Sequence, residues 1–329
     1  MPDLNVDELA NQPFAKRIRA YFGVTGPGYL QSAMTLGGGS VASCAALGSL
    51  FGYKYLWVQI VAMAFGFTVL ACAGKVGTRT GERAYKLFWN ELHPALAVIW
   101  ALSALVATII WHIPQYSLTA NGVITLAEGI NLNLESNPAR IGIGAVVFAA
   151  AAAVVYLYHA GASGLKLYER VVKTLVWGIV LAFAIAVVTG GALDWPRLIR
   201  GLRGKPVIGA LAAAVGINML FLFPYSLLQK GWGRGHRELV YFDLLTGMAV
   251  PFIIATSLMI VAVATTIGPQ PGALGEEVRD IRQIIPVIAP ALGEGAARFV
   301  IGLGITAIGF STISTHMLAI GFTASEMLG

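Results

Sequence analysis

Two short stretches of this sequence combine weak helix formers with polar groups inside long apolar runs. They are Gly37-Gly38-Gly39-Ser40 and Ile217-Asn218-Met219, and the second is followed by Pro224. An interior glycine costs a helix about 1 kcal/mol relative to alanine, and proline removes a backbone donor and clashes with the preceding turn. We therefore expect an unwound segment at each stretch. Freed backbone carbonyls, the Ser40 hydroxyl and the Asn218 amide oxygen could then bind a cation.

A polar stripe follows one face of the segment expected to form the third helix. Thr108, His112, Gln115 and Thr119 are 4, 3 and 4 residues apart, which places them on one helical face. Inside a membrane such a stripe normally faces the helix bundle or a water-filled path. His112 could relay protons there, or it could be a neutral histidine bonded to a neighbouring helix. Tyr116 is expected to line the same path.

These residues belong to a chain with the composition of a membrane protein. Of its 329 residues, 57% are hydrophobic and 12% charged, and the mean hydropathy is +0.74. A soluble domain carries roughly 25% charged residues, so a water-soluble enzyme, a nucleic-acid-binding protein and a disordered tail are excluded. The formal net charge is +6. The Lys and Arg residues occur in short connections between apolar runs, where they set membrane orientation.

Eight apolar segments are long enough to span a bilayer, which takes about 20 residues. They lie at about 24–47, 53–74, 95–123, 141–159, 171–190, 207–229, 239–267 and 296–321. Helices are expected, because backbone groups in lipid must be satisfied within their own segment and no period-2 pattern indicates a barrel. Residues 1–20 then form a cytoplasmic segment, and residues 21–329 form one domain in a bacterial inner membrane. Most basic loops fall on the side of the N-terminus, although the loop from Arg197 to Lys205 does not.

The sequence supports neither an enzyme nor a bound cofactor. No His-Glu-x-x-His, phosphate-binding loop or dinucleotide-binding glycine pattern occurs. Gly161-Ala162-Ser163-Gly164 is similar to the serine motif of rhomboid proteases, but it is expected in a basic loop with no histidine in reach. Cys44 and Cys72 lie in apolar segments, so a disulfide is not expected. The polar start of the chain argues against a secretory signal peptide.

The two interrupted segments are the first and the sixth of the eight. Broken helices at matching positions of two halves indicate a secondary transporter built from inverted repeats, with its site near the bilayer midplane. Alternatively, the glycines only allow helices to pack closely. Two repeats of five helices would need ten, so we expect that the sequence is truncated after the eighth.

Five short motifs follow one another along the chain in an order that is typical of a known family. They are Gly26-Pro27-Gly28-Tyr29-Leu30 ahead of Leu36 to Ser40, Phe51-Gly52-Tyr53 with Leu56-Trp57, Thr80-Gly81-Glu82-Arg83, Arg237-Glu238 with Phe242-Asp243, and Gly309-Phe310-Ser311-Thr312. In order and spacing the chain resembles the Nramp (natural resistance-associated macrophage protein) family of divalent-metal transporters, and among them the Nramp-related magnesium transporters. The resemblance implies an all-α, LeuT-type fold with discontinuous helices 1 and 6 and a role in metal-ion transport.

The resemblance also implies a place for the eighth helix, which approaches the break in the first helix of this fold. Ser311 and Thr312 are therefore expected to border a cation path. The alternative is that these hydroxyls bond between helices or to their own preceding turn.

The metal-binding residues of that family are not reproduced. Gly37 stands where the aspartate of the family's Asp-Pro-Gly-Asn motif belongs, and Ser40 stands where its asparagine belongs. A match anchored on Val215-Gly216 puts Leu220, Phe221 and Leu222 at the family's Met-Pro-His, so Met219 falls one residue early and could serve only if the break is shifted. We therefore expect the aspartate, the thioether and the proton-linked histidine to be missing, and we do not expect proton coupling.

Together these observations predict a membrane transporter that moves a divalent cation by alternating access. The expected substrate-binding residues are Gly37, Gly38, Gly39, Ser40, Ile217, Asn218 and Met219, with Ser40 and Asn218 as metal ligands, directly or through water. His112, Gln115, Tyr116, Ser311 and Thr312 are expected along the pathway. Oxygen donors without a central carboxylate favour partly hydrated Mg²⁺ over Mn²⁺ or Fe²⁺.

Two alternatives stay open. The half-helix that begins near Ser40 directs N–H groups at the cavity, which would suit a small anion or a zwitterion such as an amino acid. A membrane-embedded binding or scaffold protein that has lost transport is the other.

Overall fold

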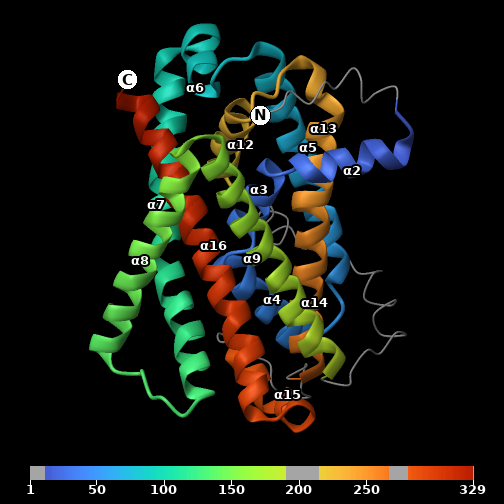
Figure 1. The fold of residues 1–329 in the computed structure, drawn as a ribbon, viewed down its shortest axis with the longest axis vertical. Coiled ribbons are helices and arrows are strands. Elements are labelled where there is room, and N and C mark those ends of the chain that lie inside the picture. The colour runs from blue at the N-terminus through green and yellow to red at the C-terminus, as the bar shows by residue number, and fades with distance from the viewer. Residues whose placement is uncertain (1–11, 190–214, 267–280, 329) are drawn as a thin grey trace.

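The computed structural model describes residues 12–189, 215–266 and 281–328 (Figure 1). In these ranges the chain is helical and contains no strand. Six of the described helices are long and apolar enough to cross a membrane, and one bent pair of helices supplies a seventh span. The all-α membrane architecture expected from the apolar runs is confirmed.

The first span is broken where the glycines predicted a break. α3 (Pro27–Thr35) and α4 (Gly38–Phe51) meet at 55°, with Leu36 and Gly37 between them. Pro27 begins α3 where the helix needs no N–H donor, and Gly37 is extended. Every residue of α3 is buried. This half-helix therefore lies inside the bundle.

In the sixth predicted span, the structure differs from the predicted unwound stretch. Ile217, Asn218 and Met219 are not unwound but form the first turn of α12 (Ile217–Gln229), which continues through Pro224. Val215 and Gly216 precede it without helical structure. α12 thus begins after Gly216, and Pro224 does not break it, because proline deletes only one intrahelical hydrogen bond. Residues 207–214 of the predicted span lie outside the described residues.

The other predicted spans are also helical. They are α5 (Leu56–Thr80), α7 (Pro94–Glu128), α8 (Asn137–His159), α9 (Gly161–Thr189), α14 (Val250–Thr266) and α16 (Glu294–Leu328). α13 (Arg237–Asp243) joins α14 through the π-helical segment η3 (Leu244–Ala249). α9 begins earlier than the predicted 171, so Lys166, Arg170 and Lys173 lie on a helix and not in a loop.

Several short helices were not predicted, because they lack a long apolar run. They are α2 (Phe14–Val24), α6 (Ala84–Leu87), η1 (Phe88–Leu92), η2 (Arg234–His236), η4 (Ile281–Ile284) and α15 (Ile285–Leu292).

The broken first span and α12 pack among the long helices. α16 packs along α7 and α9, α4 packs on α14, and α12 packs on α5 (Figure 1). α16 approaches α7 so closely that a Cβ at Gly309 would lie 2.0 Å from Thr119 Oγ1. This close approach brings the polar stripe of α7 and the hydroxyls of α16 up to the break in the first span.

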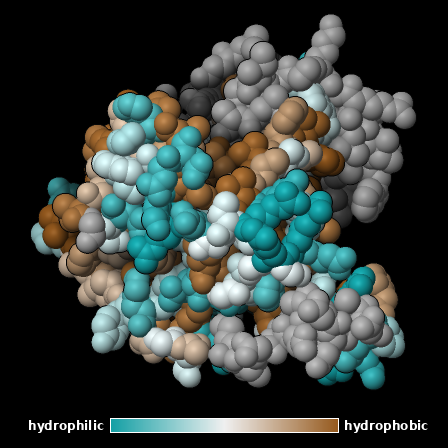
Figure 2. Space-filling model, turned by 90° about the horizontal axis from the view of Figure 1, so that it is seen from above, coloured by the Kyte–Doolittle hydropathy of each residue, from teal (hydrophilic) through white to brown (hydrophobic). Residues whose placement is uncertain are grey.

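Basic residues gather at the end of the bundle where α6 lies. Figure 2 shows hydrophilic residues on this end face beside apolar ones. Lys75, Arg79, Arg234 and Arg237 together line a hollow of about 550 Å³ here. Four of the basic residues that were expected on one side of the membrane are thus neighbours in space.

Candidate functional site

A cavity of about 220 Å³ lies where the break in the first span meets the start of α12. Five helices contribute to it, namely α3, α4, α7, α12 and α16. It is lined by Met34, Thr35, Gly39, Ser40, Ser43, Trp111, Gln115, Gly216, Asn218, Met219, Thr312 and His316. Among these residues of the described chain there is no aspartate or glutamate, so the donors that face the cavity carry no formal negative charge.

The break in the first span is held by side chains from other helices. The Gly38 N–H donates to Gln115 Oε1 at 2.9 Å, and the Thr312 hydroxyl donates to the carbonyl of Ala33 at 2.9 Å. The Ser40 hydroxyl donates back to the Thr35 carbonyl. Gln115, Thr312 and Ser40 therefore fix the geometry of the break from three elements.

The carbonyls at the break differ from the expected ones. The Gly37 carbonyl accepts the Val41 N–H within α4, because Gly38 and Gly39 are already helical and their carbonyls point along that helix. Met34 and Thr35, in the last turn of α3, line the cavity instead, and the Thr35 carbonyl accepts the Ser40 hydroxyl. The C-terminal end of a helix carries partial negative charge and favours a cation.

Met219 joins the two sides of the cavity. Its sulfur lies 3.2 Å from Thr35 Oγ1 on α3 and 3.4 Å from the Gly216 nitrogen. The side chain is 2% exposed and lines the cavity. Met219 thus lies at the cavity, where it was expected among the substrate-binding residues, although the position matched to the family's methionine lacks a thioether. The position one residue earlier in the sequence supplies it, because α12 begins at Ile217.

Asn218 and Ser40 both line the cavity, but each already has a local partner. Asn218 Oδ1 accepts the Met219 N–H at 3.0 Å, and the Ser40 hydroxyl is bonded to Thr35. Each oxygen keeps further lone pairs for a ligand or a water.

Other predicted residues lie beside the cavity without lining it. Gly37, Gly38 and Ile217 belong to the ends of the half-helices. Ser311 is fully buried and its hydroxyl donates to the Ile308 carbonyl of its own helix, as the structural alternative for these hydroxyls predicted. His112 Nε2 lies 3.0 Å from the Tyr116 hydroxyl, one turn further along α7.

Six lining residues were not predicted: Met34, Thr35, Ser43, Trp111, Gly216 and His316. Helical spacing could have found two of them. Ser43 follows Ser40 by three residues and His316 follows Thr312 by four, so each pair shares a helix face.

A second polar cluster surrounds the other end of α3. The Asp243 carboxylate accepts the N–H of Gly26 at 2.8 Å and of Gly28 at 2.6 Å. Lys230 Nζ lies 2.8 Å from the Glu169 carboxylate and donates to the Val24 carbonyl at 2.6 Å.

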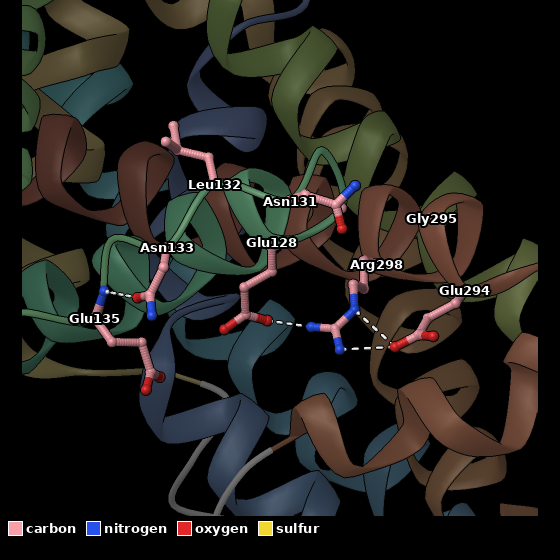
Figure 3. Close-up of a pocket in the computed structure, with 9 residues that line it drawn as sticks. Glu128, Asn131, Leu132, Asn133, Glu135, Glu294, Gly295 and Arg298 are labelled. Carbon is pink, nitrogen blue, oxygen red and sulfur yellow. Dashed lines mark hydrogen bonds and ion pairs between the residues drawn. The ribbon is translucent and has the colours of Figure 1, made fainter.

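A larger hollow of about 670 Å³ opens near the start of α16 and holds three glutamates. Figure 3 shows Glu128 and Glu294 both directed at Arg298. Because this arginine already neutralises two of the carboxylates, the hollow is less suited to binding a metal ion than its three glutamates suggest.

Comparisons with known proteins find a matching family model and several relatives. Residues 28–329 match the family model described as natural resistance-associated macrophage protein-like. The chain is 26% identical to the divalent metal cation transporter MntH 1 of Pseudomonas aeruginosa, over 89% of this chain and 67% of that protein. It is 25% identical to the divalent metal cation transporter MntH of Agrobacterium fabrum, over 94% and 67%.

The fold is similar to that of a mutant of the Eremococcus coleocola manganese transporter. The TM-score is 0.73 at 15% identity, over 95% of this chain and 66% of that one. The chain spans about two thirds of the length of these relatives.

Proposed function

The chain belongs to the natural resistance-associated macrophage protein (Nramp) family, and on this premise we propose that it carries a divalent metal cation across a membrane through the cavity between α3, α4 and α12. The observation that carries the proposal is the set of neutral donors that line the cavity at the break in the first span. Met219 contributes a thioether, and Ser40, Asn218 and Thr312 contribute oxygens. Rocking of helices about such a central site gives alternating access.

The size of the cavity suits a cation that keeps part of its hydration shell. Water occupies about 30 Å³ per molecule in the liquid, and the cavity measures about 220 Å³. With no lining carboxylate to replace the charge stabilisation of water, complete dehydration would be costly. Ser40 and Asn218 would then bind the ion directly or through water.

The position of Met219 changes the expected order of ions. Hydrated Mg²⁺ ranked first on the assumption that the site offers only oxygen. A thioether at the cavity favours softer divalent ions, so we place Mn²⁺ and Fe²⁺ first and hydrated Mg²⁺ second. The relatives from Pseudomonas aeruginosa and Agrobacterium fabrum are named as divalent metal cation transporters, which supports the class of substrate.

Uptake into proteoliposomes tests the proposal. We expect uptake of Mn²⁺ or Mg²⁺ that falls in Ser40→Ala and Asn218→Ala and that persists when the pH gradient is removed. Ser49→Ala is a matched control, because Ser49 is also on α4 but bonds within its own helix and does not line the cavity. Transport of no divalent cation by the wild type would overturn the proposal.

Transport of a small anion or an amino acid is the second candidate. The helix N-termini of α4 and α12 both end at the cavity, and such ends attract anions. However, the Gly38 N–H is already bonded to Gln115 Oε1, which removes one donor that an anion would need. Including glycine and chloride in the same uptake panel separates the two candidates.

A further inference from the structure

Four basic side chains converge on the hollow of about 550 Å³ at the end of α5. Lys75 and Arg79 belong to the last two turns of α5, whereas Arg234 comes from η2 and Arg237 begins α13. All four residues are exposed, and Thr78 completes the described lining of the hollow. This lining therefore carries four cations and no carboxylate.

The acidic residues that are nearest in sequence have other partners. The Glu238 carboxylate lies 3.8 Å from the Arg17 guanidinium, and the Glu82 carboxylate lies 4.0 Å from the Lys86 ammonium. Among the described residues, none of the four cations of the hollow has a carboxylate partner. Like charges that gather in one hollow repel one another, so an anion bound there would relieve the repulsion.

Two ordinary roles account for only part of this cluster. A cation near the C-terminus of a helix is favourable, which explains Lys75 and Arg79, and basic connections set membrane orientation. Neither role requires that Arg234 and Arg237, from a separate connection, line the same hollow as these two residues. Their convergence is therefore the observation that points to a ligand.

The two arginines of this connection are held in place through one nitrogen each. Arg234 Nε donates to the Arg79 carbonyl at 2.8 Å. Arg237 Nε donates to the Tyr241 hydroxyl at 3.2 Å, and its guanidinium carbon lies 5.4 Å from the centre of that ring. Each guanidinium has terminal N–H groups for a further acceptor, and such paired donors match the oxygens of a phosphate. The hollow thus has the chemistry of a phosphate site.

An exposed apolar stripe on α5 leads to the hollow. Phe65, Val69 and Val76 are 61%, 44% and 53% exposed, and their spacing of 4 and 7 residues places them on one face of the helix. Arg79 follows Val76 by three residues and continues this face at the helix end. An apolar stripe that ends at cations matches a molecule with acyl chains and an anionic headgroup, whereas a free phosphate has no use for the stripe.

We propose that the hollow between α5, η2 and α13 binds the phosphate headgroup of an anionic phospholipid, whose acyl chains lie along the apolar stripe of α5. Basic pockets beside membrane spans attract such headgroups, and each cation near the membrane surface strengthens binding about fivefold. The inference concerns a different part of the chain from the cavity and does not depend on the ion that the protein carries.

Native mass spectrometry of the purified full chain in detergent tests the inference. Phosphatidylglycerol and phosphatidylcholine are titrated separately, and we expect the wild type to bind phosphatidylglycerol at least about tenfold more tightly. In the double variant Arg234→Gln with Arg237→Gln, the affinity for phosphatidylglycerol should fall about 25-fold, or about fivefold for each cation. The affinity for phosphatidylcholine should change less than about twofold, because its headgroup carries no net charge.

The matched control is Lys166→Gln with Arg170→Gln. Both residues are exposed cations of α9 that do not line the hollow, so this variant should bind phosphatidylglycerol as the wild type does. An equal loss in the two double variants would overturn the site, because the lipid would then respond to overall charge.

Two results on the wild type alone would also overturn the inference. Equal affinities for the two lipids would show that the four cations do not select a headgroup. Inorganic phosphate that displaces phosphatidylglycerol at an equal concentration would show that the hollow takes a free anion and that the apolar stripe contributes nothing. These measurements need no variant, so the test stands even if Arg234→Gln with Arg237→Gln folds poorly.

Discussion

The two ends of α3 lie in opposite electrostatic environments. At its N-terminal end, the Asp243 carboxylate accepts two backbone N–H groups, and the buried pair of Lys230 and Glu169 lies beside it. At its C-terminal end, the helix stops at a cavity whose lining residues are all formally neutral or histidine. One nine-residue helix thus joins a charged, fully bonded cluster to an open, uncharged site.

This difference shows that the buried charges at one end of α3 stabilise the fold, whereas the neutral groups at the other end are available to bind an ion. Buried charges are tolerated at the N-terminal end because each one meets an opposite charge or the orphan donors of a helix end. The groups at the cavity make local hydrogen bonds but keep lone pairs, a thioether and an imidazole for a passing ion. Breaking the charged end should therefore affect folding, and altering the cavity should affect selectivity.

The largest effect is expected from breaking the buried ion pair. The Lys230 and Glu169 side chains are 2% and 9% exposed, so Lys230→Met leaves a carboxylate buried without its cation. We expect a loss of about 3–5 kcal/mol in the free energy of unfolding, measured by denaturation in detergent.

A double variant provides the control for this pair. Glu169→Gln combined with Lys230→Met removes both charges and should recover most of the loss. If the single and double variants are equally destabilised, the pair contributes through packing and not through charge.

Asp243→Ala should have an effect of similar size. It leaves the N–H groups of Gly26 and Gly28 buried without an acceptor, and hydrogen bonds to charged groups contribute about 1.5–3 kcal/mol each. Asp243→Asn keeps one oxygen acceptor and should be milder in the same unfolding measurement. An unchanged midpoint in Asp243→Ala would show that water replaces the carboxylate at this end of α3.

A pair of glycines at the two ends of the helix sharpens the comparison. A Cβ at Gly28 would lie 2.2 Å from the Asp243 backbone carbonyl, whereas one at Gly37 would first meet the Thr312 side chain at 3.2 Å. We expect Gly28→Ala to cost about 1–3 kcal/mol of stability through overpacking. Gly37→Ala should be tolerated, and thermal denaturation of both variants checks the difference.

The sequence predicted the spans well, and the reason is physical. Apolar runs of bilayer length have no stable form in lipid other than a helix, so every predicted segment that the structure describes is helical. The glycines at 37 to 39 indicated that the first span is broken, although only Gly37 lies in the break and Gly38, Gly39 and Ser40 already belong to α4. The start of α9 was missed because Lys166, Arg170 and Lys173 interrupt its apolar run, although their long side chains can lie along a helix.

The site was harder to predict, since it depends on the exact start of one helix. A shift of one residue turns a side chain by about 100° on a helix, and this shift decides whether Met219 or Leu220 faces α3. The partners of Asp243 lie more than 200 positions away in the sequence. No local pattern encodes such pairs, and His316 was inconspicuous among the hydroxyls of α16.

Met219→Leu is expected to change the stability least, and it tests the neutral, C-terminal end of α3 most directly. Leucine has nearly the same volume, so the cost should stay below about 1.5 kcal/mol. The substitution removes the sulfur that lies 3.2 Å from Thr35 Oγ1. We expect Mn²⁺ affinity to fall about tenfold, equivalent to about 1.4 kcal/mol, with Mg²⁺ affinity little changed, as measured by calorimetry. Met259→Leu, fully buried in α14 away from the cavity, should leave both affinities unchanged. An equal loss of affinity for Mn²⁺ and Mg²⁺ in Met219→Leu would mean that the thioether shapes the cavity without selecting the ion. The distinction between a binding end and a structural end of α3 would then rest on the oxygens and the imidazole alone.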